Sequence, residues 1–120
     1  MLGKYKHERL PDNDVFYDLT RRNIDVQELL FVTNILITDY SSCYIDFLLL
    51  KRPVIFYLYD NYEKEDNELY FTPKEHNVGA ICETEEELLE AIKHPKVKNS
   101  NLYHHDYNFD ACKQILLKLI

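Results

Sequence analysis

Glycine is scarce in this sequence, since only Gly3 and Gly79 occur among 120 residues. A GxGxxG loop or a P-loop is therefore excluded, because each needs several glycines at fixed spacing. Tryptophan is absent. The three cysteines are widely spaced and form no CxxC pair, so they do not indicate a disulfide framework. We expect reduced, buried thiols in a cytoplasmic protein.

Long apolar runs are also missing. None approaches the roughly 18 residues of a membrane-spanning helix, and the start, MLGKYKHERL, has no apolar secretory segment. Positive charge is in the minority, since 14 Lys and Arg stand against 21 Asp and Glu, for a net charge of −7. Nucleic acid is therefore not an expected partner, and the surface as a whole is not a polybasic membrane anchor.

The most informative stretch runs from Asn34 to Tyr59 and reads NILITDYSSCYIDFLLLKRPVIFYLY. Its apolar runs at 35–37 and 54–59 predict two strands, and the apolar block at 44–50 predicts a buried helix between them. Strands joined by a helical crossover are parallel. The polar turn 38–42 then falls at the carboxyl end of the first strand, the edge where open α/β sheets bind ligands.

The rest of the chain continues the alternation of strands and helices. Before the central stretch, the sequence predicts a brief β-type run at 15–17 and a helix from Asp25. After it, the sequence predicts a polar acidic surface loop at 60–73, a strand at 79–82 and a helix at 84–94 with Leu88, Leu89 and Ile92 inward. The chain ends in a predicted amphipathic helix that includes Ala111, Ile115 and Leu119. This order predicts an α/β fold in which helices flank a parallel, Rossmann-like sheet. The length fits a single domain, residues 1–120.

Thr38, Asp39, Ser41 and Ser42 stand where the predicted buried helix begins. The first N–H groups of a helix have no internal partners and carry partial positive charge. Together with the serine hydroxyls they favour a phosphate site that needs no glycine. The alternative is plain helix capping, which Asp39, Ser41 or Ser42 could each perform.

His7 follows the first weakly apolar segment and reaches the same sheet edge if that segment is a parallel strand. A histidine there can contact a phosphate or move a proton near neutral pH; an ordinary surface histidine is the alternative. The cluster His104-His105-Asp106 does not predict a metal site, because neighbours in an extended segment point apart and no further ligand pair has the right spacing. We expect neither a metal nor a cofactor.

The central stretch resembles the carboxyl-terminal domain of the CDP-glycerol glycerophosphotransferases, the teichoic acid primase and polymerase family. The family's LITDYSS matches residues 36–42, its FDF or FDY matches Ile45-Asp46-Phe47, and its L-K-x-P matches residues 50–53. Weaker similarity from Asn77 to Cys112 extends the resemblance over most of the chain.

The resemblance implies a GT-B arrangement of two Rossmann-like halves, with this chain as the carboxyl-terminal half that binds CDP-glycerol or a related CDP-polyol. It implies direct transfer of glycerol phosphate to a teichoic acid or capsule-type polymer, with release of CMP. By the same resemblance, Ser41 and Ser42 hold the donor pyrophosphate together with Thr38 and Asp39. His7 matches the family histidine that contacts the phosphates and is the expected catalytic residue.

Two departures from the family pattern keep alternatives open. The acceptor half is not among these 120 residues, and Glu68-Leu69 stand where the family has Arg-Gly. We expect a cytoplasmic protein whose missing half supplies any peripheral contact with the inner face of the membrane. One alternative is a non-catalytic remnant or partner-binding module of the same fold. The other is the donor half of a sugar-nucleotide glycosyltransferase.

Overall fold

The computed structural model describes residues 15–20, 22–60, 72–98 and 111–120. The chain divides into two compact units, residues 1–32 and 33–120. In the first unit, helix α1 spans Val26–Val32 and buries Leu30. Asp25 Oδ1 accepts a hydrogen bond from the Gln27 N–H at 2.8 Å, which confirms the predicted helix start. Residues 15–17 form neither helix nor strand and are exposed, so the β-type run predicted there is wrong.

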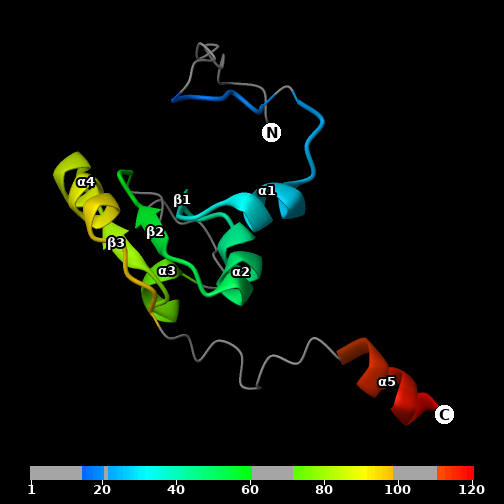
Figure 1. Cartoon of the computed structure of the whole chain (residues 1–120). Coiled ribbons are helices and arrows are strands. Elements are labelled where there is room, and N and C mark those ends of the chain that lie inside the picture. Colours follow the sequence, from blue (N-terminus) through cyan, green and yellow to red (C-terminus); the bar gives the residue numbers. More distant parts are fainter. Residues whose placement is uncertain (1–14, 21, 61–71, 99–110) are drawn as a thin grey trace. The chain divides into compact units, whose positions relative to one another are not determined.

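The second unit is built on a parallel sheet. Its strands are β1 (Leu36–Thr38), β2 (Val54–Tyr57) and β3 (Ala80–Cys82), in the order β1-β2-β3. Thr38 pairs with Phe56, and Phe56 pairs with Ile81, so the carboxyl ends of all three strands meet at one edge (Figure 1). The predicted Rossmann-like sheet is confirmed, although β2 ends at Tyr57 and not at residue 59.

The crossover from β1 to β2 contains α2 (Cys43–Phe47) and a 3₁₀ turn, η1 (Leu48–Leu50). Tyr44, Phe47 and Leu48 are buried on the sheet side, whereas Asp46 and Leu49 are exposed. The turn ends at Lys51, whose φ of 53° is left-handed. Arg52 is half-buried, and its Nη1 donates to the Thr33 carbonyl at 2.7 Å. This bond fastens the entry of β2 to the segment that leads into β1.

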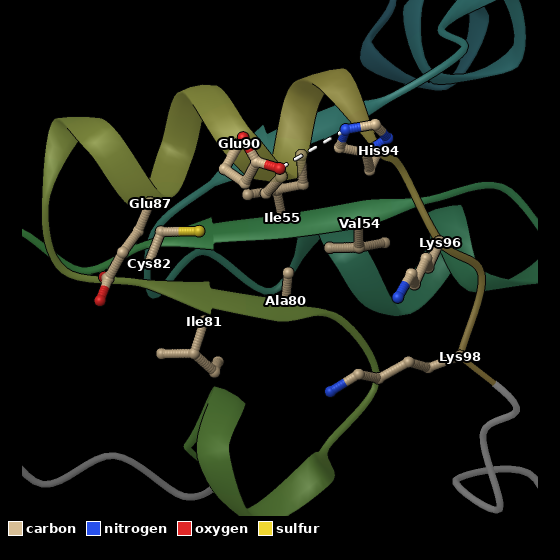
Figure 2. A pocket seen from close by; sticks show the side chains of 11 residues that line it. Val54, Ile55, Ala80, Ile81, Cys82, Glu87, Glu90, His94, Lys96 and Lys98 are labelled. Carbon is tan, nitrogen blue, oxygen red and sulfur yellow. Dashed lines mark ion pairs between the residues drawn. The ribbon is translucent and has the colours of Figure 1, made fainter.

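Helices cover both faces of the sheet. Figure 2 shows α4 (Glu85–Lys93) on one face of β2 and β3, and α3 (Pro73–His76) on the other. Helix α2 shares the face of α3, because Tyr44 contacts both Phe56 and His76. The largest fully buried side chains are Val54, Ile55, Phe56, Phe47, Val78 and Pro73. The core thus lies around β2, the central strand.

Two short helices in this unit begin with the same motif. The side chain of Thr72 accepts from the Glu75 N–H and the carboxylate of Glu75 accepts from the Thr72 N–H, and Thr84 and Glu87 repeat this box on α4. The box on α4 confirms the predicted start of that helix. Helix α3 was not predicted; only its first residue, Pro73, lies in the predicted loop 60–73, and residues 61–71 of that loop are outside the described residues.

The apolar face of α4 differs from the prediction. Leu88 is half-buried, but Leu89 and Ile92 are 51% and 37% exposed. The helix therefore turns the side that carries Leu88 and Ala91 to the sheet, so the prediction holds for Leu88 and is wrong for Leu89 and Ile92. Helix α5 spans Ala111–Leu119, as predicted, and its Ile115 and Leu119 are exposed. Among the described residues, no helix is long and apolar enough to cross a membrane.

Candidate functional site at the carboxyl edge of the sheet

The turn between β1 and α2 holds four of the five predicted site residues. Thr38 is the last residue of β1, and Asp39, Ser41 and Ser42 follow it before α2 begins at Cys43. The parallel pairing of β1 with β2 puts this turn at the carboxyl edge of the sheet. The position is therefore the one where open α/β sheets bind their ligands.

Asp39 and Ser41 are engaged with the backbone of the turn. Asp39 Oδ1 accepts from the Ser41 N–H at 3.1 Å, a local bond typical of Asx turns. Ser41 Oγ accepts from the Cys43 N–H at 3.5 Å, a long and weak contact. Thr38 Oγ1 lies 3.7 Å from Cys43 Sγ. The Ser41 N–H that Asp39 accepts from precedes α2, so only the Ser41 contact reaches an N–H of the helix, and capping of α2 is weak.

Ser42 behaves differently from its two neighbours. It occupies the N-cap position with helical angles, φ −72° and ψ −4°, and its side chain makes no capping hydrogen bond. Its carbonyl accepts from the Ile45 N–H at 3.0 Å, as expected at a helix start. The residue is exposed. Its hydroxyl therefore takes no part in capping α2.

The structure does not describe the remaining sequence candidates. His7 is outside the described residues, as are His104, His105 and Asp106. In the part of the chain that the structure describes, no three His, Cys, Asp or Glu side chains group as metal ligands would. The turn is thus the one predicted site whose geometry can be stated.

A partly buried polar contact next to this turn was missed by the sequence analysis. Tyr44, in the first turn of α2, is 3% exposed, and its hydroxyl hydrogen-bonds with His76 Nδ1 at 2.5 Å. Burial raises the pKa of the Tyr44 phenol, so the hydroxyl keeps its proton at neutral pH. The sequence contains one signal for α3 (Pro73–His76), the helix that carries His76. Thr72-Pro73 followed by Glu75 is a capping box with proline at the first helical position.

The charges near the carboxyl end of β3 are paired. Lys74 Nζ lies 3.2 Å from Glu83 Oε1, which links α3 to the residue directly after β3. On α3 itself, hydrogen bonds from the Thr72 backbone and side chain lower the pKa of Glu75. That carboxylate is therefore ionised at neutral pH, and it keeps its bond to the Thr72 N–H.

A separate pocket of about 680 Å³ lies between α4 and the strands β2 and β3. Its lining residues are Val54, Ile55, Ala80, Ile81, Cys82, Glu87, Glu90, Ala91, His94, Lys96 and Lys98. Figure 2 shows the ion pair between Glu90 and His94, 3.5 Å apart, on its α4 side. None of the residues 38–42 lines this pocket, so it is distinct from the predicted phosphate site.

The parallel sheet, its helical crossover and a polar turn at the carboxyl edge define a Rossmann-like α/β domain. The chain matches the family described as CDP-glycerol:poly(glycerophosphate) glycerophosphotransferase over residues 3–111. It belongs to this family, as the residues of the β1–α2–β2 stretch indicated.

Curated relatives agree with this assignment. The chain is 40% identical over 97 residues to a teichoic acid poly(glycerol phosphate) polymerase of Bacillus spizizenii, a match that covers 79% of this chain and 23% of the relative. It is 37% identical over 87 residues to a teichoic acid glycerol-phosphate transferase of Staphylococcus aureus, covering 71% of this chain and 22% of the relative. A teichoic acid glycerol-phosphate primase of Bacillus subtilis is 33% identical over 108 residues, covering 82% and 27%.

These matches leave most of each relative uncovered, since the chain spans about a quarter of their length. The comparison with solved structures gives no significant match.

Proposed function

We propose that this chain is a single donor-binding domain of a glycerophosphotransferase, corresponding to the carboxyl-terminal half of a GT-B enzyme. Family membership supports the reaction class. The observation that carries the site is the Ser42 hydroxyl, which lies in the family motif at the carboxyl edge of the sheet and is not used in capping. The ligand is the diphosphate of CDP-glycerol or a related CDP-polyol, held by Ser41 and Ser42 in a turn shaped by Thr38 and Asp39.

The proposed reaction is a direct displacement at phosphorus. A terminal hydroxyl of a teichoic acid or capsule-type polymer attacks the phosphorus that bears the glycerol. The new P–O bond forms as the bond to the bridging oxygen breaks, CMP leaves with the bonding electron pair, and the hydroxyl proton passes to a base. His7 contacts the phosphates in this scheme, and the hydroxyls of the turn stabilise the charge that develops on CMP. No metal or other cofactor is invoked.

The rest of the enzyme supplies the acceptor side. Catalysis needs both reactants positioned in one cleft, so we expect this chain to bind the donor alone but to transfer it only together with the acceptor half. We place the complete enzyme in the cytoplasm, at the inner face of the membrane.

Calorimetric titration with CDP-glycerol tests the site. Loss of a hydroxyl that bonds a charged phosphate should weaken the affinity about tenfold in Ser42→Ala. His7→Ala should also bind more weakly, whereas Ser100→Ala, at the one serine outside the turn, should bind like the wild type. Absence of binding by the wild type, or equal binding by all four proteins, would remove the assignment. Thermal shifts with CDP-ribitol and UDP-sugars separate this proposal from a sugar-nucleotide glycosyltransferase.

A second candidate function is a partner-binding module without catalysis. It is favoured by Glu68-Leu69, which stand where the resemblance places Arg-Gly. The coding sequence next to this one decides between the two: an adjacent acceptor half supports the enzyme. If CMP release stays at background when the two halves are mixed with donor and polymer, the module is the better description.

A further inference from the structure

The Tyr44–His76 hydrogen bond joins two segments that are 32 residues apart in the chain. Tyr44 lies two residues after Ser42, in the first turn of α2. His76 is the last residue of α3. The contact therefore connects the start of the helix behind the candidate phosphate turn to a second element on the same face of the sheet.

Helix α3, which carries His76, is closed by hydrogen bonds at both ends. The capping box of Thr72 and Glu75 closes the start of α3, and the Asn77 N–H donates to the Pro73 carbonyl at 3.1 Å to close its end. Two residues further on, a β-carbon on Gly79 would overlap the Val54 carbonyl oxygen, so the chain here lies directly against β2. His76 is thus presented to Tyr44 from a segment with little room to shift.

The Tyr44 ring is held from the sheet as well. It packs edge-to-face on Phe56, with ring centroids 4.9 Å apart and planes at 82°. Phe56 in turn pairs with Thr38, the residue that opens the turn. The start of α2 is therefore positioned by β2 through a ring and by α3 through a hydrogen bond.

Helix α2 has only five residues, too few to be stable by its own backbone bonds. Its first turn must be held by tertiary contacts of this kind. Loss of the His76 ring nitrogen would leave the Tyr44 hydroxyl buried without a partner, which costs more free energy than the bond itself contributes. The first turn would then shift to hydrate the hydroxyl.

We propose that His76 is a positioning residue for the donor diphosphate, which acts through Tyr44 to hold the Ser41–Ser42 turn in its binding geometry. This inference rests on the proposed function of that turn. His76 does not touch the ligand in this scheme; it fixes the residues that do.

Donor titrations with matched variants test the inference in the full chain. Tyr44→Phe and His76→Phe each keep an aromatic ring and remove the bond, and we expect each to bind CDP-glycerol about three- to tenfold more weakly. His76→Asn keeps a polar atom where Nδ1 lies, so it should recover most of the affinity. His94→Phe, at the exposed end of α4, should bind like the wild type. Binding of cytidine should be unchanged in every variant, because only the diphosphate meets the turn.

Equal affinity of Tyr44→Phe, His76→Phe and wild type for CDP-glycerol would overturn the proposal. A parallel loss of cytidine and CDP-glycerol binding would also overturn it, because that pattern indicates a general loss of fold.

A second measurement needs no ligand and separates this proposal from the proposed function. In hydrogen exchange, the amides of Ile45 and Leu48, which donate to the Ser42 and Tyr44 carbonyls, should exchange about three- to tenfold faster in Tyr44→Phe and His76→Phe than in the wild type or His94→Phe. If they do, while the wild type binds no CDP-glycerol, the turn is positioned by His76 but the donor assignment is wrong. Unchanged exchange would overturn the positioning role whatever the donor result.

Discussion

Gly79 lies directly against Val54: a β-carbon on Gly79 would overlap the Val54 carbonyl oxygen and touch the Phe56 ring at 3.0 Å. The overlapping atom belongs to the backbone of the central strand, so it cannot move away as a flexible side chain could. We therefore expect Gly79→Ala to destabilise the protein by about 1–3 kcal/mol, the usual cost of overpacking. Urea denaturation measures it, with Glu86→Ala on exposed α4 as the control. An unchanged midpoint for Gly79→Ala would contradict the close approach.

The capping box of α3 predicts a dependence on pH. Hydrogen bonds from Thr72 lower the pKa of Glu75, so the folded state is stabilised by the ionised carboxylate. That contribution is complete above the usual Glu pKa of about 4.3 and is lost as the pH falls through the lower pKa of the folded state. Thermal unfolding should therefore show wild type and Glu75→Ala converging below about pH 4.

Two further variants test the same box. Glu75→Gln keeps an oxygen that can accept from the Thr72 N–H, so the difference in stability between Glu75→Gln and Glu75→Ala should not change over this pH range. Thr72→Ala removes the cap and should cost about 1 kcal/mol at neutral pH. A difference between wild type and Glu75→Ala that grows on acidification would mean the sign of the pKa shift is wrong.

The bond from Arg52 to Thr33 predicts a cost for losing the guanidinium. Arg52→Met keeps much of the side-chain volume and leaves the Thr33 carbonyl without this donor, so we expect a loss of about 1–2 kcal/mol at this half-buried position. Arg52→Lys retains the charge with a shorter reach and should fall between the two. Denaturant midpoints measure the series, and a Met variant as stable as the wild type would show that the bond contributes nothing.

The three free cysteines should differ in reactivity toward an aromatic disulfide reagent. Cys112 is exposed, Cys43 is half-buried and Cys82 is buried. Burial, and then the charge of Glu87, raises the pKa of the Cys82 thiol, which also lowers its thiolate fraction. Cys112 should react first and Cys82 only when the protein unfolds. Cys112→Ser should abolish the fast phase; a fast phase that survives in this variant would contradict the order.

The parallel sheet and the position of the turn at its carboxyl edge could both be predicted from the sequence. Apolar runs separated by a helical block leave few topologies, and a parallel crossover is the one that also puts residues 38–42 at the ligand edge. The sequence could not predict which side chains of a uniformly apolar segment are buried and which are exposed. Phe47 is fully buried and Leu49 is 43% exposed, yet the block at 44–50 gives no periodic signal that separates them. Their difference follows from the packing of α2 and η1 on the sheet.

Contacts between residues far apart in the chain could not be predicted from the sequence either. Tyr44 and His76 come from different elements, and the polar neighbours of His76, Glu75 and Asn77, give no sign of a buried partner. The local signal for α3 was present in Thr72-Pro73 and Glu75, but it was hidden at the end of an acidic segment that has no period. A capping box locates a helix start; it does not show which buried hydroxyl the last residue of that helix will meet.

The register of the sheet has a consequence for the order of events during synthesis. Thr38 is held by Phe56, in a strand that follows α2 in the chain. During translation, the LITDYSS segment is synthesised before β2, the strand that pairs with its Thr38. The turn can therefore reach its final shape only after residues 54–57 have left the exit tunnel, and nascent chains stalled before that point should not bind the proposed donor.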